Sequence, residues 1–244
     1  LSLRARLNGR KFLRVYDLQN SDRTSLYLRL LSPRPEWVGS ARGASHRNAS
    51  ALRTAGKSYE GHVQTLALAG IADVRPDDLS WVSGDTGRFH LPQRYALLIP
   101  GSAPERPEKR WPAQAYGALA GMIDRQGIHP VILGAAAEEG LAQTICGIHP
   151  RAINLAGRTD LLDIALLARG AAGAVGNDTG PMHLIAATGC PSHVLFSQHS
   201  DPARHAPSGK AVFVMRHENL SALKAEDVMQ RLNFRNHFPA QKIS

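Results

Sequence analysis

From Arg94 onward, short apolar runs alternate with amphipathic stretches. Residues 95–99 are continuously apolar and end in Pro100-Gly101, which predicts a buried parallel strand. Similar runs occur at 130–134, 152–155, 172–176, 193–197 and 211–215, and helical spacing occurs at 112–125, 138–146, 160–169, 179–188 and 221–232. Strands that alternate with helices of this length predict βαβ units, a parallel sheet and helices on both of its faces.

Helix-start residues support this division. Pro112 suits the first turn of a helix, where the N–H that proline lacks would have no partner. Thr159 or Asp160 is expected to cap the helix at 160–169, and Ser221 to cap the last helix.

The first 90 residues have weaker periodicity. Residues 12–16 predict a strand, and residues 24–31 predict a helix that stops before Pro33. Residues 59–69 predict a second helix, ended by Gly70.

Two segments of this part, 32–57 and 71–93, are rich in Pro, Gly, Ser and charge, and the second is typical of an interdomain linker. We therefore predict an α/β protein with one α/β domain over residues 1–90 and a second over 91–244. The chain opens on Leu1, and its first residues resemble the interior of a longer protein. We expect further residues upstream and an incomplete N-terminal domain.

Composition restricts the class of protein. Apolar residues make up 43% of the chain, as is ordinary for a globular protein. The N-terminus lacks a signal-peptide pattern, and no apolar run approaches the roughly 18 residues of a membrane span. Two distant cysteines, Cys146 and Cys190, predict neither a disulfide framework nor a zinc site. These features favour a cytoplasmic protein.

The net charge of +9 favours anionic partners. The basic residues are spread out, with the densest group at Arg4, Arg6, Arg10, Lys11 and Arg14. No aromatic residues interleave with them as in RNA-binding motifs, so we expect no nucleic-acid partner. A solvated basic face and an anion-docking face both remain open.

The clearest candidate site is the turn from Gly176 to His183. It follows a predicted strand, and in an open α/β sheet ligands bind at the carboxyl ends of strands. Gly180 lets a ligand approach the backbone, and the helix start after it offers free N–H groups to phosphate. An ordinary helix start, capped by Asp178 or Thr179 with His183 on the surface, explains the same residues equally well.

Two further turns lie at predicted strand ends. The small residues Gly101 and Ser102 leave room for a ligand, and Lys109 beyond them can reach a phosphate, although such a lysine is usually solvated. After Gly134, Glu138 and Glu139 can accept from ribose hydroxyls or simply complement a helix N-terminus. We find no dinucleotide fingerprint, no P-loop and no convincing carboxylate pair for Mg²⁺, so we predict neither a metal nor a cofactor.

Together these segments resemble glycosyltransferase family 9, the family of the lipopolysaccharide heptosyltransferases. The resemblance covers about residues 95–232, with the run Asn177 to His183 as its most specific part. The other matching segments are Pro100-Gly101-Ser102, Lys109-Arg110-Trp111-Pro112, Leu133-Gly134 with Glu138, Asn154-Leu155-Ala156-Gly157 and Ala186-Ala187. Asp17-Leu18-Gln19 with Arg23-Thr24-Ser25 is similar to an acceptor-domain loop of the family.

The resemblance implies a GT-B fold, in which two Rossmann-like domains with parallel sheets hold the active site in a cleft between them. Residues 91–244 would bind the nucleotide sugar, and the last helix would pack back on the N-terminal domain. Residue by residue, the resemblance places Asp178, Thr179, Gly180 and His183 around the donor diphosphate. Lys109 would neutralise the diphosphate, and Glu138 or Glu139 would contact the nucleoside.

Asp178 is itself negative, so we expect it to orient the turn and its donors. Gly101 and Ser102 would form a donor loop. Asp17, Gln19 and Arg23 are the acceptor-side candidates.

The implied activity is metal-independent, inverting transfer of a heptose-like sugar from an ADP-sugar to a lipopolysaccharide core acceptor. The acceptor would be an anionic, lipid-linked saccharide at the cytoplasmic side of the inner membrane. Family members carry the proposed catalytic base in a strand-turn-helix upstream of the position of Asp17, so we expect the base in a missing N-terminal segment. The alternatives are a non-catalytic sugar-nucleotide-binding protein, degenerate in its N-terminal half, and a basic α/β module that binds nucleic acid.

Overall fold

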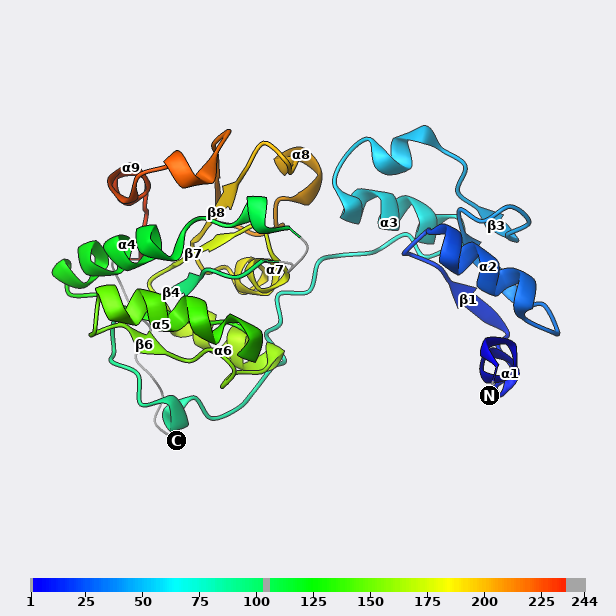
Figure 1. Cartoon of the computed structure of the whole chain (residues 1–244). Coiled ribbons are helices and arrows are strands. Elements are labelled where there is room, and N and C mark those ends of the chain that lie inside the picture. The colour runs from blue at the N-terminus through cyan, green and yellow to red at the C-terminus, as the bar shows by residue number, and fades with distance from the viewer. Residues whose placement is uncertain (1, 103–105, 236–244) are drawn as a thin grey trace. The chain divides into compact units, whose positions relative to one another are not determined.

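Two sheets, both entirely parallel, organise the chain (Figure 1). The structure is a computed structural model that describes residues 2–102 and 106–235. Contacts divide the chain into two compact units, Leu1–Arg75 and Pro76–Ser244. The smaller sheet lies in the first unit and the larger sheet in the second.

The larger sheet has six strands in the order β6-β5-β4-β7-β8-β9. The strands are β4 (Tyr95–Ile99), β5 (His129–Ile132), β6 (Ile153–Asn154), β7 (Ala174–Asn177), β8 (Ser192–Phe196) and β9 (Val212–Arg216). The chain builds outward from β4 to β6, then returns to the other side of β4 and builds outward to β9. The direction therefore reverses between β4 and β7, the kind of switch point where open α/β sheets bind ligands.

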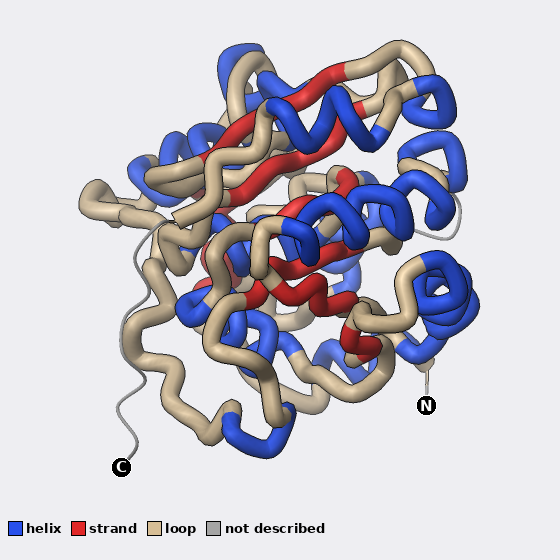
Figure 2. The backbone as a smooth tube through the Cα atoms, turned by 90° about the vertical axis from the view of Figure 1, so that its left-hand side faces the viewer, coloured by secondary structure: helices blue, strands red, loops and turns tan. Residues whose placement is uncertain are grey.

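Helices cover both faces of this sheet, as the alternation of apolar runs predicts (Figure 2). They are α4 (Ala113–Arg125), α5 (Glu139–Ile148), α6 (Leu161–Gly170), α7 (Gly180–Ala187), α8 (Pro202–His205) and α9 (Ala225–Gln230). Asp160 caps α6 by accepting from Leu162 N and Asp163 N, each at 2.8 Å, so of the two predicted caps Asp160 is the one used.

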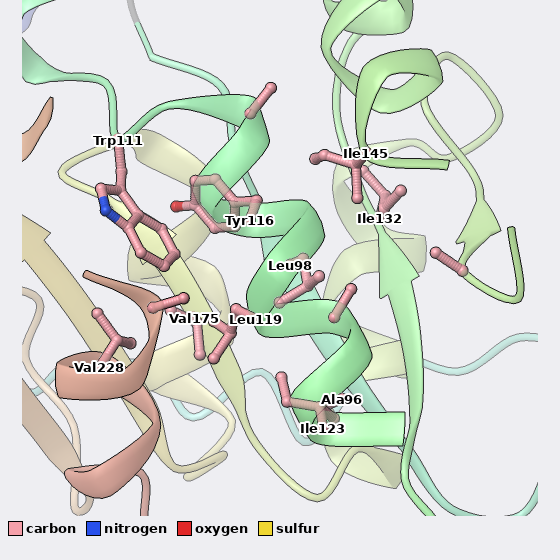
Figure 3. Packing of buried hydrophobic residues seen from close by; sticks show 14 of the residues in the cluster. Ala96, Leu98, Trp111, Tyr116, Leu119, Ile123, Ile132, Ile145, Val175 and Val228 are labelled. Atoms are coloured by element: carbon pink, nitrogen blue, oxygen red, sulfur yellow. The ribbon is translucent and has the colours of Figure 1, made fainter. Parts of the chain in front are cut away.

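The core consists of two apolar layers, one on each face of β4. Ala96 and Leu98 point toward α4, where they pack with Tyr116, Leu119 and other side chains (Figure 3). The alternate residues of the strand belong to the opposite layer, against α6 and α7; they are Tyr95, Leu97 and Ile99. A strand buried on both faces explains why its sequence is apolar without alternation.

The smaller sheet has the order β1-β2-β3. Its unit contains α1 (Leu3–Asn8), β1 (Arg14–Tyr16), α2 (Asp22–Leu30), β2 (Glu36–Gly39), β3 (His46–Arg47) and α3 (Ser58–Ala67). The predicted strand at 12–16 and the helices at 24–31 and 59–69 are present with shifted ends. The segment 32–57, for which the sequence predicted no helix or strand, holds β2 and β3. They were missed because each is short and turn-forming residues flank both.

The unit boundary at 75/76 differs from the predicted domain boundary at 90/91. Much of the predicted linker is attached to the second unit, because Val82 and Phe89 are buried and Arg169 of α6 donates to Val82 O at 2.6 Å. Arg88 also pairs with Asp163 of α6. The extended segment before β4 is visible in Figure 1.

The start of the last helix of the second unit differs from the expectation. Ser221 lies in a 3₁₀ turn, Leu220–Ala222, and α9 begins only at Ala225, after Lys224. Val228 of α9 is fully buried in the layer formed by α4, so this helix packs within its own unit (Figure 3).

Candidate functional site

Asn177 connects the two strand ends at the switch point. The turn was expected to begin at Gly176, but β7 continues through Asn177, whose side chain is fully buried. Its amide donates to Pro100 O at 2.7 Å, and its Oδ1 accepts from Trp111 N at 3.0 Å. Because both ends of the loop after β4 are attached to one side chain of β7, Lys109 is held near the β7 turn.

Lys109, Asp178 and Ser200 form a hydrogen-bonded triangle. Lys109 Nζ lies 2.8 Å from Asp178 Oδ2 and 3.2 Å from Ser200 Oγ, and Ser200 Oγ donates to the same carboxylate oxygen at 2.5 Å. The side chain of Asp178 is 9% exposed and that of Lys109 is 18% exposed. Two donors satisfy the buried carboxylate of Asp178. The same contacts fix the position of the Lys109 ammonium, which keeps a donor for a ligand.

Ser200 was not among the sequence candidates. It lies in the turn between β8 and α8 and is 5% exposed. Its position in a loop more than twenty residues after Asp178 left no local spacing that could reveal the contact.

Helix α7 begins at this triangle. Thr179 is its N-cap residue, but the Thr179 side chain makes no capping hydrogen bond. Gly180 and Pro181 follow, and a Cβ built on Gly180 would meet nothing within 4 Å. The helix start therefore keeps unused backbone donors beside open space, which is the arrangement that binds phosphate groups.

His183 lies one turn into α7 on its exposed side. Partial burial lowers the pKa of its imidazole below the ordinary value; nearby His205 acts in the same direction and Asp178 opposes both. At neutral pH the ring is therefore largely uncharged, so it can donate one hydrogen bond to an oxyanion.

A pocket of about 460 Å³ adjoins the start of α7. Its lining residues come from the end of β4, the turns after β4, β5 and β6, and the starts of α6 and α7: Ile99, Ser102, Leu133, Gly134, Ala135, Glu138, Thr159, Asp160, Leu161, Ile164, Thr179 and Pro181. The lining is mostly apolar with a few polar groups, which is typical of a small-molecule site.

Glu138 and Glu139 differ in position. Glu138 lines the pocket, accepts from Ala135 N at 2.8 Å, and lies so close to Gly101 that a Cβ there would be 1.6 Å from Glu138 Oε1. Glu139 instead accepts from Asn154 Nδ2 at 2.9 Å and is absent from the lining. Of the two candidates, the structure thus places Glu138 at the pocket.

The donor-loop residues occupy the adjoining wall. Gly101 O accepts from Asn177 Nδ2 at 3.3 Å. Ser102 lines the pocket and accepts from Arg110 Nε at 2.9 Å. Residues 103–105 between Ser102 and Lys109 lie outside the described residues.

The acceptor-side candidates lie in the first unit. Asp17 is 5% exposed, and one of its oxygens accepts from Asn20 N at 2.9 Å while the other has no hydrogen-bond partner. Arg23 donates to Gln19 on the surface at 3.3 Å. Asp17 thus shapes the turn after β1, whereas the other two side chains are open to solvent.

Within residues 2–102 and 106–235, no three His, Cys, Asp or Glu side chains gather as a metal site requires. In the same residues, no helix is long and apolar enough to cross a membrane.

Solved structures share this fold. The chain is similar to a structure described as E. coli ADP-heptose lps heptosyltransferase II, with a TM-score of 0.73 and 23% identity over 93% of this chain and 77% of that one. A structure described as E. coli heptosyltransferase WaaC with ADP gives a TM-score of 0.68 and 23% identity, over 93% and 74% of the two chains. The α/β fold with its two parallel sheets is therefore that of the GT-B heptosyltransferases.

Sequence relatives point the same way. Lipooligosaccharide heptosyltransferase 2 of Haemophilus influenzae is 33% identical over 113 residues, which are 44% of this chain and 33% of that protein. The Haemophilus ducreyi protein of the same name is 28% identical over 52% of this chain and 43% of its own length. The chain thus spans less than half the length of these relatives. The sequence model of glycosyltransferase family 9 (heptosyltransferase) matches residues 1–233, and the chain belongs to that family.

Proposed function

We propose that this protein transfers a heptose-like sugar from an ADP-sugar to a lipopolysaccharide core acceptor, with inversion and without a metal ion. The observation that carries the proposal is the triangle of Lys109, Asp178 and Ser200 at the start of α7, next to the pocket that Glu138 lines. A cation, free helix N–H groups and a carboxylate beside an apolar pocket match the three parts of a nucleoside diphosphate. Solved structures of related enzymes, by their descriptions, contain ADP and ADP-2-deoxy-2-fluoro heptose.

In this site the diphosphate lies between Lys109 Nζ and the N–H groups at Thr179 and Gly180. His183 adds a neutral donor from the exposed side of α7. Glu138 accepts from the ribose hydroxyls, and the apolar part of the pocket around Leu161 and Ile164 takes the base.

The chemistry follows from these positions. An acceptor hydroxyl attacks the anomeric carbon, its proton passes to a base, and the bond between that carbon and the diphosphate oxygen breaks as ADP leaves. Negative charge develops on the departing diphosphate, so fixed donors at Lys109, α7 and His183 stabilise the transition state more than the bound donor. The proposed base belongs to sequence upstream of Asp17.

The acceptor proposed here is an anionic, lipid-linked saccharide, reached at the cytoplasmic side of the inner membrane. The net charge of +9 supports an anionic partner.

A transfer assay tests the proposal with the full-length protein. ADP-heptose and a heptose-free core acceptor are incubated without divalent metal and with EDTA, and the acceptor is followed by mass spectrometry. We expect addition of one heptose and release of ADP. If calorimetry detects no binding of any ADP-sugar, the proposal is wrong; donor binding without transfer supports the non-catalytic alternative.

A further inference from the structure

Arg110 lies next to Lys109 in the chain, but no step of the proposed reaction uses it. Its side chain is half-buried, and its guanidinium makes two hydrogen bonds to a single residue. Nε donates to Ser102 Oγ at 2.9 Å, and Nη2 donates to Ser102 O at 3.0 Å. One side chain therefore holds both the hydroxyl and the backbone carbonyl of Ser102, which joins residue 110 to residue 102.

This contact is the second of two that join the beginning and the end of the loop after β4. The first is made by Asn177, whose amide donates to Pro100 O at 2.7 Å and whose Oδ1 accepts from Trp111 N at 3.0 Å. The pair of Arg110 and Ser102 follows it at both ends of the loop. Asn177 therefore holds the base of the loop, and Arg110 holds the next level.

The two residues that flank this contact belong to different parts of the proposed donor site. Ser102 is 6% exposed and lines the pocket proposed for the nucleoside. Lys109 directly precedes Arg110 and lies at the place proposed for the diphosphate. Asp178 and Ser200 hold the Lys109 ammonium without the help of Arg110, so the loss of Arg110 should act mainly on Ser102.

The charge of Arg110 does not explain its position. Its guanidinium forms no ion pair with a carboxylate of residues 2–102 and 106–235. Arg110 lines a separate pocket of about 400 Å³ together with Glu108 and Glu218, which offset its positive charge there. It is absent from the lining of the nucleoside pocket. The planar fork of donors, which lysine lacks, is therefore the property that the contact with Ser102 uses.

We propose that Arg110 is a positioning residue of the donor site, which holds Ser102 in the wall of the nucleoside pocket and does not itself touch the nucleotide. The inference rests on the proposed function, which identifies that pocket as the nucleoside site. An interaction that is equally strong in the bound donor and in the transition state changes KM and leaves kcat unchanged. Because the nucleoside is remote from the bond that breaks, Arg110 should act on KM for the donor, whereas Lys109 should act on kcat.

Three single variants of the full-length protein, with one control, test the proposal. Arg110→Gln removes both the charge and the fork, and Arg110→Lys keeps the charge alone. Ser102→Ala removes the hydroxyl acceptor and keeps the carbonyl. Arg125→Gln is the control, because Arg125 is exposed in the last turn of α4. Calorimetry measures the affinity for ADP, steady-state transfer gives KM for ADP-heptose and kcat, and thermal unfolding shows that each variant is folded.

We expect Arg110→Gln and Arg110→Lys alike to weaken ADP binding and to raise KM for ADP-heptose about tenfold, with kcat changed less than about threefold. Arg125→Gln should match the wild type. Ser102→Ala should cause a smaller loss of ADP affinity than Arg110→Gln. Its addition to Arg110→Gln should cause little further loss, because the two residues act as one unit.

Three results would overturn the inference. If Arg110→Lys binds ADP as tightly as the wild type, the charge is sufficient and the fork is not needed. If the losses of Arg110→Gln and Ser102→Ala add in the double variant, Arg110 does not act through Ser102. If kcat falls as much as KM rises, Arg110 acts on the transition state. Should Arg110→Gln fail to fold, Arg110→Lys and Ser102→Ala provide the same comparisons.

The binding measurement separates this inference from the proposed function. If the wild type transfers heptose and Arg110→Gln retains its affinity for ADP and its KM, the role of Arg110 alone is contradicted. If the wild type binds ADP but transfers no heptose, the proposed transfer alone is contradicted, and a loss of ADP affinity in Arg110→Gln still supports the role of Arg110.

Discussion

At the scale of single residues, the proposed donor site depends on a lysine whose position is set by its neighbours. Lys109 contacts both Asp178 and Ser200, and the three atoms lie within 3.2 Å of one another. Sequence reasoning could select Lys109 and Asp178, because each lies in a turn that follows a strand of the predicted parallel sheet. It could not select Ser200, because loop contacts far along the chain have no periodic signal.

Lys109→Met should reduce the rate of sugar transfer by roughly 10²–10³, because one preorganised donor to developing charge is worth about 2–4 kcal/mol. Ser200→Ala should reduce it less, since Asp178 still holds the ammonium, and Ser200→Thr should restore the rate. Lys210→Met is the matched control, because Lys210 is exposed and lies just before β9, at the opposite strand end. Steady-state kinetics of sugar transfer measure these rates. An equal loss of rate in Lys109→Met and Lys210→Met would contradict the role proposed for Lys109.

His193 predicts a pH dependence of stability. This histidine is fully buried in β8, stacks on Phe213 and accepts from Asn233 N at 3.1 Å. Burial lowers the pKa of His193 from 6.5 to about 4. Between these two pKa values the unfolded chain therefore binds a proton at His193 and the folded chain does not. The contribution of His193 to the free energy of unfolding is fully present above pH 6.5 and is lost as the pH falls toward 4.

The expected loss is of the order of 3 kcal/mol between pH 7 and pH 4, since each unit of pKa corresponds to about 1.4 kcal/mol. Urea unfolding at both pH values measures it. His193→Gln should remove most of this pH-dependent loss, whereas His205→Gln, at an exposed position in α8, should not. If the free energy of unfolding of His193→Gln falls between pH 7 and pH 4 as much as that of the wild type, other groups cause the pH dependence.

At the scale of elements, the long apolar strands were the most predictable part. β4 is buried along its whole length, and its sequence is correspondingly apolar throughout. The strands of the first unit were harder, because β3 has two residues and β2 four, and such short segments carry little periodicity. The choice between Glu138 and Glu139 also needed the structure, because the 3₁₀ turn Ala136–Glu138 decides which carboxylate enters the pocket.

The start of α7 can be tested by closing the space beside it. Gly180→Ala adds a methyl group that meets nothing within 4 Å in the free protein, so the fold should be unaffected or stabilised by up to about 1 kcal/mol. If the diphosphate lies against this backbone, the same methyl group should weaken ADP binding about tenfold or more. Gly147→Ala in α5 is the control, because its Cβ is equally unobstructed and distant in the fold. Thermal unfolding measures the stability of the variants, and calorimetry measures their affinity for ADP. If Gly180→Ala binds ADP as tightly as the wild type, the diphosphate does not lie against this backbone.

At the scale of the whole molecule, the proposed donor site lies within one of the two units. Every residue proposed to hold the nucleotide diphosphate lies in the unit that begins at Pro76. Residues 76–90 belong to it through Val82, Phe89 and the pairing of Arg88 with Asp163, which the composition of the segment did not reveal.

A fragment of residues 76–244 should therefore bind ADP with the affinity of the whole chain, within about a factor of three, whereas a fragment beginning at 91 should be less stable. The shorter fragment lacks Val82 and Phe89, so the apolar surface that they cover is exposed to water. Exposing apolar surface lowers the free energy of unfolding by about 25 cal/mol per Å². Calorimetry and thermal unfolding of both fragments test this. Weak ADP binding by a folded 76–244 fragment would show that the first unit contributes to the donor site.

The contact between Gly101 and Glu138 has a consequence for reading related sequences. A methyl carbon at position 101 would overlap the Glu138 carboxylate, so a larger residue there would make this flexible side chain turn away from its present place at the pocket. The two positions are therefore expected to be coupled: relatives in which the acid keeps this place at the pocket keep glycine at 101, and in relatives with a larger residue at 101 the acid is displaced from it. Since Glu138 is proposed to hold the ribose, a larger residue at 101 would mark, in sequence alone, the branches of the family in which the ribose is held in another way.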